Sequence, residues 1–231
     1  LMSRIKTRQL TVGIILLTSF AAVMAAIFMP WFDGGNALNY LDNLYNTISK
    51  GSAYYIPKVQ HEVEAMPPTP VNLNLELASA ETAERARALL VAAGTEALVE
   101  GDTVKVEGDL RAVFASCIED AEAAYHNRGE VLAARYGEDA RTALHAWWRT
   151  LGAIERDLNR QRRFDAARLT HTVQAKAVEC AYNYYGIEAQ QIRDRWGTVL
   201  FSLVFYVLYT VWYGYGIMLT FEGLGFELSA H

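Results

Sequence analysis

The chain has 231 residues, a formal net charge of −5 and no long basic tract. Nucleic-acid binding needs a basic face, so this charge argues against a nucleic-acid partner. Only two cysteines and no CxxCH motif are present, which excludes a four-thiolate iron–sulfur cluster and covalent c-type haem.

Two stretches without a charged residue lie near the two ends of the chain, at 10–29 and 200–221. Each reaches the roughly 20 apolar residues that cross a hydrocarbon core about 30 Å thick. We therefore predict a membrane protein with two transmembrane helices, over 10–29 and 197–220, joined by one large loop. The first run is longer than a signal-peptide core of about 7–15 residues, so we expect an uncleaved signal anchor.

The orientation follows from the flank before the first helix. Residues 1–9 contain Arg4, Lys6 and Arg8 and no acidic residue. The positive-inside rule keeps this tail in the cytoplasm, and the second helix returns the tail 221–231 to the same side. We expect the chain in the bacterial inner membrane, with the lipid bilayer around its spans and the loop in the periplasm.

The segment 30–70 holds all five prolines and predicts irregular structure around one short helix. After Asn36, a good N-cap residue, leucines recur at helical spacing as far as Ile48. Two placements of this juxtamembrane amphipathic helix stay open, because it can lie on the bilayer surface or pack on the loop domain. The proline-rich stretch 66–70 then forms a stiff linker.

Residues 71–128 predict a small α+β domain. Apolar residues alternate strictly over 71–77, which is the pattern of a half-buried strand. A helix capped by Ser79 and ended by Gly94 follows, then a hairpin turning at Gly101 and a second helix capped by Asp109. The order is β-α-β-β-α, with the helices on one face of the sheet.

Residues 129–196 predict an antiparallel helical hairpin. A second arm, from Val173 to Ile187, follows a turn at 160–165 and leads toward the second span. Cys117 and Cys180 both lie on apolar helical stripes, so two buried thiols and a disulfide both stay open. The first arm carries a seam spaced alternately 4 and 3, as in a coiled coil: Ala140, Leu144, Trp147, Leu151, Ile154 and Leu158.

Several side chains outside the spans suggest chemistry, and each has a simpler interpretation. Glu122 and His126 lie four residues apart, but a carboxylate-bridged metal site needs further ligands that the pattern lacks, so we predict a surface pair. His145, close to Trp147 and Trp148, indicates packing or a subunit contact rather than an aromatic pocket. A basic run predicts a solvated face at the hairpin tip, with an acidic partner as the alternative: Arg156, Arg160, Arg162, Arg163 and Arg168.

The motifs of common enzymes are absent from the sequence. GxSxG, GxGxxG and the phosphate-binding P-loop do not occur. Neither span contains Asp, Glu, Lys, Arg or His, which argues against a haem held by this chain alone and against an ion pump. We predict no catalytic residue, no metal and no cofactor.

The second span carries a stripe of small and hydroxyl-bearing residues spaced 4, 3, 4, 3 and 4: Ser202, Tyr206, Tyr209, Tyr213, Gly216 and Thr220. A phenol in hydrocarbon has no partner unless a neighbouring helix supplies one, and small residues let helices approach closely. We predict that part of the stripe contacts other integral membrane subunits, with Tyr206, Tyr209 and Tyr213 as the hydrogen-bonding contacts. The alternative is pairing with the chain's own first span. That pairing would use Thr11, Thr18, Ala22 and Ala25.

These features together predict a non-catalytic accessory subunit of a larger membrane complex, of a respiratory or photosynthetic electron-transfer kind. Its spans and periplasmic domain would anchor and brace partner subunits. The alternative is an extracytoplasmic ligand sensor or receptor that signals through a separate partner, because the tails are too short for an output domain. A membrane-bound enzyme whose site no motif reveals is the third option.

Overall fold

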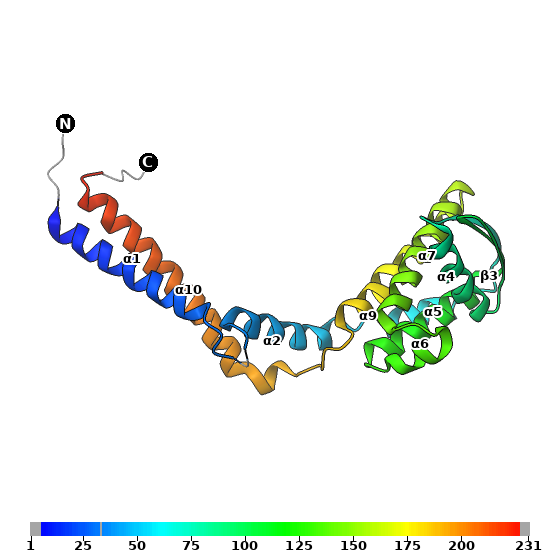
Figure 1. Cartoon of the computed structure of the whole chain (residues 1–231), viewed down its shortest axis with the longest axis horizontal. Helices are drawn as coiled ribbons and strands as arrows, with labels where there is room; N and C mark the ends of the chain where they lie inside the picture. Colours follow the sequence, from blue (N-terminus) through cyan, green and yellow to red (C-terminus); the bar gives the residue numbers. More distant parts are fainter. Residues whose placement is uncertain (1–5, 33, 227–231) are drawn as a thin grey trace. The chain divides into compact units, whose positions relative to one another are not determined.

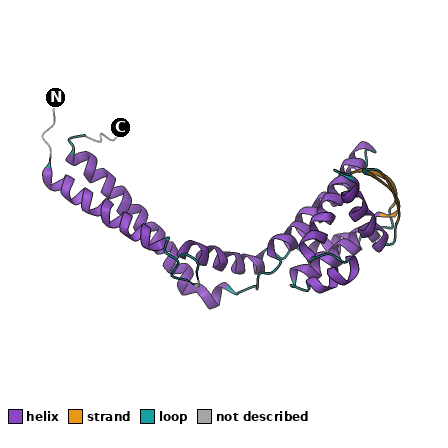
Figure 2. Ribbon diagram, in the orientation of Figure 1, coloured by secondary structure: helices purple, strands orange, loops and turns teal. Residues whose placement is uncertain are grey.

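The computed structural model describes residues 6–32 and 34–226 and divides the chain into two compact units. The span unit comprises the residues up to Ser49 and those from Ala189 onward, and the loop unit is Lys50–Glu188. Figure 2 shows that the fold is mostly helical, with the strands confined to one part of the loop unit. A mostly helical fold with one small sheet and two long apolar helices agrees with the predicted fold class at that level.

The span unit is built on α1 (Thr7–Ile27) and α10 (Ile192–Gly223), which lie side by side along most of their length (Figure 1). Their 21 and 32 residues span about 32 and 48 Å at 1.5 Å per residue. By length and composition both are able to cross a membrane. α10 extends beyond the predicted 197–220 at both ends, because no helix-breaking residue lies in 192–196.

The amphipathic helix α2 (Ala37–Ser52) begins where the sequence predicts. The side-chain oxygen of Asn36 accepts a hydrogen bond from the N–H of Asn39 at 2.9 Å, which confirms Asn36 as its cap. A further helix, α3 (Ile56–Glu64), occupies a stretch where no helix was predicted. It buries Ile56, Val59 and Val63, so the segment without regular structure before the first strand is shorter than predicted.

The β-α-β-β-α part of the loop unit matches the sequence pattern. A three-stranded antiparallel sheet has the order β1-β3-β2, from β1 (Pro70–Glu76), β2 (Glu96–Glu100) and β3 (Thr103–Asp109). α4 (Ala80–Ala92) and α5 (Leu110–Tyr125) complete it. Ser79 caps α4 by accepting from the N–H of Thr82, and Asp109 caps α5 by accepting from the N–H of Arg111. On β1, every second side chain is buried: Val71, Leu73 and Leu75.

The predicted helical hairpin is present in a more divided form. α6 (Gly129–Tyr136) is a separate helix before the first arm, α7 (Ala140–Arg160). The returning arm consists of α8 (Phe164–Val173), a π-helical turn η1 (Gln174–Val178) and α9 (Glu179–Tyr184), all packed on α7. This arm ends before Gly186, whose φ of +83° stops a helix, so it does not run on into α10.

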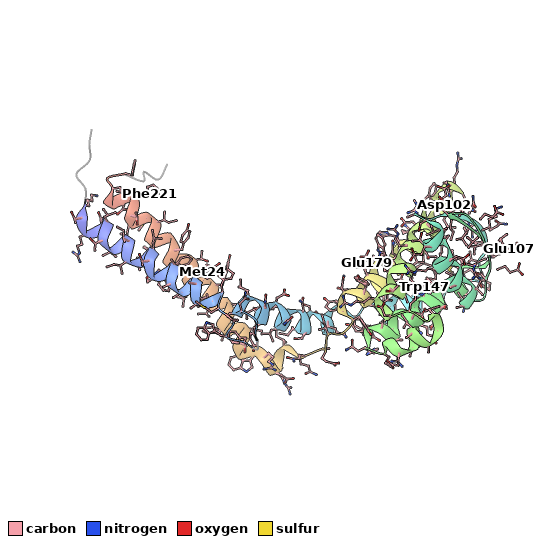
Figure 3. The ribbon with its side chains drawn as sticks, viewed as in Figure 1. Met24, Asp102, Glu107, Trp147, Glu179 and Phe221 are labelled. Carbon is pink, nitrogen blue, oxygen red and sulfur yellow. The ribbon has the colours of Figure 1, made fainter. Side chains whose placement is uncertain are left out.

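The seam of α7 forms the centre of the loop-unit core. All six predicted residues from Ala140 to Leu158 are at most 1% exposed, and Trp147, labelled in Figure 3, lies among the packed helices. Cys117 and Cys180 are both buried free thiols, which settles the alternative left open by the sequence. The Cys180 thiol donates to the backbone oxygen of Ala53 at 3.0 Å.

A buried carboxylate joins three helices in this core. Asp120 of α5 has a fully buried side chain and accepts hydrogen bonds from Trp147 Nε1 at 2.8 Å, Tyr136 Oη at 2.5 Å and Arg135 Nη1 at 2.7 Å. Burial raises the pKa of the Asp120 carboxyl, while these donors act in the opposite direction. The carboxylate therefore ties α5 to α6 and α7, and each donor offsets part of its desolvation cost.

The basic run of α7 has a different role from the predicted solvated face. β1 is an edge strand, and its free backbone carbonyls are exposed to pairing with another chain unless they are covered. Side chains at the end of α7 and just beyond it cover them. The donor–acceptor pairs are Arg156 to Glu76 O, Arg160 to Asn74 O, Gln161 to Asn72 O and Arg163 to Pro70 O, at 2.9–3.2 Å. The side chains thus occupy the position of a missing fourth strand.

Candidate functional site

The second half of the predicted stripe on α10 packs against α1. A Cβ added at Gly13 would lie 2.5 Å from Thr220 Oγ1, and one at Gly216 would lie 2.9 Å from a methyl carbon of Leu17. Beyond the stripe, a Cβ at Gly223 would lie 2.4 Å from the backbone nitrogen of Leu10. The two helices therefore approach more closely than side chains with a Cβ would permit, which is how small residues act between membrane helices.

Aromatic rings continue this contact along the two helices. The ring of Phe20 lies 6.0 Å from that of Tyr209 and 5.0 Å from that of Tyr213, between centroids. The indole N–H of Trp212 donates to the backbone oxygen of Leu16 at 3.1 Å. The sequence analysis did not predict a role for Trp212, because the stripe contains only small and hydroxyl-bearing residues. An indole N–H, however, is also a donor that needs a partner in lipid.

The face of α1 that makes these contacts differs from the predicted one. Thr11, Thr18, Ala22 and Ala25, which the alternative of self-pairing required, are all exposed. The contact runs instead through Gly13, Leu16, Leu17 and Phe20. The face of the first span given for self-pairing was therefore wrong, because both faces of this helix are apolar and the contacts of Gly13, Leu16, Leu17 and Phe20 select the other one.

The first half of the stripe opens into an apolar groove of about 680 Å³, enclosed by the C-terminal part of α1, by α2 and by α10. We refer to it as the α1–α2–α10 groove. Three predicted residues line it, namely Ser202, Tyr206 and Tyr209. Aromatic and aliphatic side chains form most of the remaining wall, including Met24, Trp31, Leu41, Phe201 and Phe205.

The polar groups of the groove divide into paired and unpaired ones. Ser202 Oγ and Tyr45 Oη lie 2.6 Å apart, so these two hydroxyls bond each other and join α10 to α2. The Trp31 indole donates to the backbone oxygen of Ala26 at 2.9 Å. The hydroxyls of Tyr206 and Tyr209 have no hydrogen-bond partner among residues 6–32 and 34–226, and Tyr206 is 59% exposed.

Two clusters in the loop unit repeat features that the sequence singled out. Glu122 and His126 form the predicted pair at 3.0 Å, and the Tyr54 hydroxyl also donates to Glu122. Within the described chain, no group of three or more His, Cys, Asp or Glu side chains is placed to hold a metal. His145 stacks on Trp148 with an interplanar angle of 11°, while Trp147 points into the core.

A buried lysine ties together the two ends of the loop unit. Lys50 is 4% exposed, and its ammonium donates to the backbone oxygens of Ile187 at 2.5 Å and Tyr184 at 3.1 Å. It also lies 4.9 Å from the centroid of the Tyr125 ring, while the Tyr125 hydroxyl donates to Lys50 O. Burial lowers the pKa of Lys50. A lysine in the last turn of an amphipathic helix ordinarily indicates solvent exposure, so the sequence contains no signal for this contact.

No protein-family model, curated protein or solved structure matches this chain.

Proposed function

We propose that the chain is a non-catalytic accessory subunit of a larger membrane complex, anchored by α1 and α10. The observation that carries the proposal is the α1–α2–α10 groove, in which two tyrosine hydroxyls have no partner within the described chain. The proposed occupant is a transmembrane helix of another subunit. Such a helix offers a polar side chain or a carbonyl as acceptor, which a lipid tail lacks.

The depth of the tyrosines favours a protein partner over a lipid headgroup. Tyr209 lies against Phe20, and α1 continues for seven residues beyond Phe20, to Ile27. At 1.5 Å per residue, Tyr209 is about 10 Å inside the end of that helix. In a hydrocarbon core about 30 Å thick, the Tyr209 hydroxyl then lies below the headgroups and needs an acceptor from another helix.

The second half of the stripe supports the same proposal, because it already contacts α1 and is not available to a partner. Tyr213, Gly216 and Thr220 face α1 or lie beside it, so they serve the chain's own hairpin. Only the first half remains for a partner, and it is there that the groove opens. We further propose that the complex belongs to an electron-transfer system and that this chain supplies anchoring rather than cofactors.

A photo-crosslinking experiment tests the groove directly. Leu203 lines the groove and is 56% exposed, while Val211 on the same helix does not line it and is 49% exposed. A photoreactive amino acid at each position should give one discrete protein adduct from Leu203 and mainly lipid adducts from Val211. Lipid adducts alone from both positions would contradict the proposal, and mass spectrometry of the adduct shows whether the partner belongs to a cofactor-bearing complex.

The tyrosines themselves are tested by replacement. A Tyr206→Phe/Tyr209→Phe double variant should insert normally and lose its companions on native gels in mild detergent, because each intramembrane hydrogen bond contributes about 0.6–2 kcal/mol. Tyr215→Phe is the matched control, since Tyr215 is 55% exposed and lies off the stripe. Full retention of the companions by the double variant would show that the hydroxyls are not the docking contacts.

The same proposal places the chain in the bacterial inner membrane with the loop unit in the periplasm. Asp165 has a side chain that is 96% exposed, so Asp165→Cys is accessible to a thiol reagent. With Cys117 and Cys180 replaced by alanine, a membrane-impermeant maleimide added to spheroplasts should label it. Labelling only after the membrane is disrupted would reverse the orientation.

A further inference from the structure

A polar cleft of about 790 Å³ lies in the loop unit and has no part in the proposal above. It is bordered by α7, by the end of β1 and by the arm that contains the π-helical turn. Its volume falls within the range of roughly 300–1,000 Å³ that is typical of sites for small ligands. Three side chains decide its chemistry: Trp148, Arg149 and Arg156.

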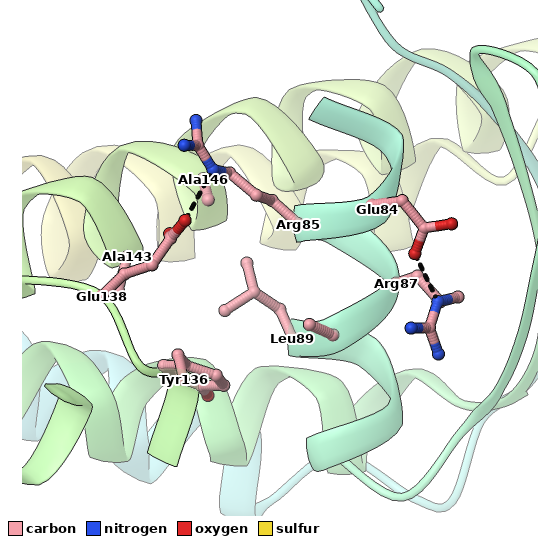
Figure 4. Close-up of a pocket in the computed structure, with 9 residues that line it drawn as sticks. Glu84, Arg85, Arg87, Leu89, Tyr136, Glu138, Ala143 and Ala146 are labelled. Carbon is pink, nitrogen blue, oxygen red and sulfur yellow. Dashed lines mark hydrogen bonds and ion pairs between the residues drawn. The ribbon is translucent and has the colours of Figure 1, made fainter. Parts of the chain in front are cut away.

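Arg149 is a half-buried cation without a partner. No hydrogen bond or ion pair joins its guanidinium to any residue in the described parts of the chain. A neighbouring pocket of about 260 Å³, shown in Figure 4, provides the contrast. There, Arg85 pairs with Glu138 at 2.8 Å and Arg87 pairs with Glu84 at 2.8 Å. Partly removing a guanidinium from water without a counter-charge is costly, so Arg149 indicates an anion that comes from outside the chain.

The second arginine of the cleft is held by a backbone oxygen rather than by an ion pair. Arg156 Nη2 donates to the backbone oxygen of Glu76 at 3.2 Å. Of the carboxylates that line the cleft, Glu76 pairs with Arg160 at 2.6 Å, and Glu155 lies 3.5 Å from His171 Nδ1, a contact that is an ion pair only when the histidine is protonated. Neither guanidinium forms an ion pair within the described chain, although the charge of Arg156 also acts on the Glu76 carboxylate, and planar guanidinium groups suit carboxylate and phosphate oxygens.

An aromatic ring is held at the rim of the same cleft. The Trp148 indole donates to Glu179 Oε1 at 2.7 Å, and its ring is 38% exposed. From the π-helical turn, Gln174 donates to the backbone oxygen of Trp148 at 2.8 Å. Short π-helical insertions often lie at functional sites. His145 lies against one face of the indole, so a planar group would stack on the other face.

A glycine in the middle of α7 also lines the cleft. A Cβ at position 152 would lie 3.3 Å from Gln174 Nε2 and 3.6 Å from Arg156 Nη1. Glycine in a helix interior costs about 1 kcal/mol relative to alanine. Gly152 therefore gives up helix stability where a Cβ would lie close to the Gln174 side chain of the π-helical turn and in contact with the second arginine.

We propose that this cleft binds a small organic anion that carries a planar ring, with Arg149 and Arg156 on the anionic group and Trp148 against the ring. The proposal does not depend on the accessory role, because every residue that carries it lies in the loop unit and none lines the α1–α2–α10 groove.

Isothermal titration of the full chain in a nonionic detergent tests the proposal with three probes: phenyl phosphate, inorganic phosphate and phenol. Phenyl phosphate should bind saturably at one site per chain, inorganic phosphate more weakly, and phenol at least about tenfold more weakly than phenyl phosphate. Absence of saturable binding by phenyl phosphate and inorganic phosphate up to about 10 mM would overturn the proposal. Equal binding of phenol and phenyl phosphate would also overturn it, since the arginines would then have no role.

Variants assign the binding to the cleft. Arg149→Gln should weaken phenyl phosphate at least about tenfold, and Arg149→Lys should restore part of that loss by restoring the charge. Trp148→Leu should reduce the affinity for phenyl phosphate to that for inorganic phosphate. Arg162→Gln is the control, because Arg162 lies outside the cleft lining and should bind as the unchanged protein does. Unfolding curves that coincide for all four variants exclude a folding defect, and unchanged affinity in Arg149→Gln places the binding elsewhere.

Discussion

The seam of α7 and the stripe of α10 have the same 4-3 spacing, yet the two helices use that spacing differently. On α7, all six residues from Ala140 to Leu158 are at most 1% exposed. On α10, Gly216 is buried, whereas Tyr206 and Tyr213 remain 59% and 46% exposed. One repeat therefore marks a complete core face, and the other marks a face that is filled along only part of its length.

On the proposal that α10 crosses a membrane, the surrounding medium explains the difference. Water drives every apolar side chain of α7 inward, so periodicity alone identifies the buried face. A lipid tail is as apolar as leucine, so α10 gains little by burying one apolar face rather than another. The face that contacts the neighbouring helix is then selected by close approach at glycines and by hydrogen bonds to polar side-chain groups. In the span unit, Gly13, Gly216 and the Trp212 indole are therefore more informative than any leucine.

The largest expected effect is a loss of unfolding free energy, and it compares the same Leu→Ala substitution on α7 and on α10. Leu151→Ala removes a side chain that is fully buried in the loop unit and should cost about 2–5 kcal/mol of unfolding free energy. Leu208→Ala removes the same atoms from a residue that is 60% exposed on α10, where lipid takes their place if the helix spans the membrane as proposed, and should cost no more than about 0.5 kcal/mol. Denaturant unfolding in one detergent, followed by tryptophan fluorescence, measures both.

A substitution on the surface of the loop unit is the control for these two variants. Arg162→Ala lies at the turn after α7 and should change the unfolding free energy by about 0.5 kcal/mol or less. A loss for Leu151→Ala no larger than that for Arg162→Ala would mean that the α7 seam is not the core. An equally large loss for Leu208→Ala would mean that the α10 face is covered by protein rather than lipid.

The helices and strands of the loop unit could be predicted from local sequence patterns, because water favours burial of the apolar face of each element. Alternation at 71–77 predicted β1, and Ser79 and Asp109 predicted the starts of α4 and α5. The helix α3 was missed because the nearby prolines suggested a linker. Pro57, however, lies in the first turn of α3, where its missing N–H costs nothing.

Contacts between residues far apart in the sequence could not be predicted from local sequence patterns. The arginines that cover β1 lie about 80–90 positions from the carbonyls they contact, and nothing in their immediate sequence differs from that of a solvated face. The α1–α2–α10 groove depends on the Tyr45–Ser202 bond in the same way, across 157 positions. The stripe on α10 was predicted, but its division between α1 and the groove required the arrangement of three helices.

The smallest effect tests the close contact of α1 and α10 through two glycines that differ only in their surroundings. Gly13→Ala places a Cβ 2.5 Å from Thr220 Oγ1 and 2.6 Å from the Thr220 backbone nitrogen, so the helices must separate locally. Gly214→Ala meets nothing within 4 Å. Both changes raise helix propensity by about 1 kcal/mol, but only the first adds an overpacking cost of about 1–3 kcal/mol.

Disulfide crosslinking within the chain measures whether the two helices separate in the Gly13→Ala variant. The Gln9 amide donates to Glu222 at 3.0 Å, so cysteines at these two positions, with Cys117 and Cys180 replaced, report the distance between the helix ends. Crosslinking in membranes should be fast with Gly214→Ala and clearly slower with Gly13→Ala. Equal rates would show that α1 slides or rotates to accept the methyl group. In that case the glycine contact would not select the face of α1, and the face would be set by the Phe20 ring contacts and the Trp212 hydrogen bond instead.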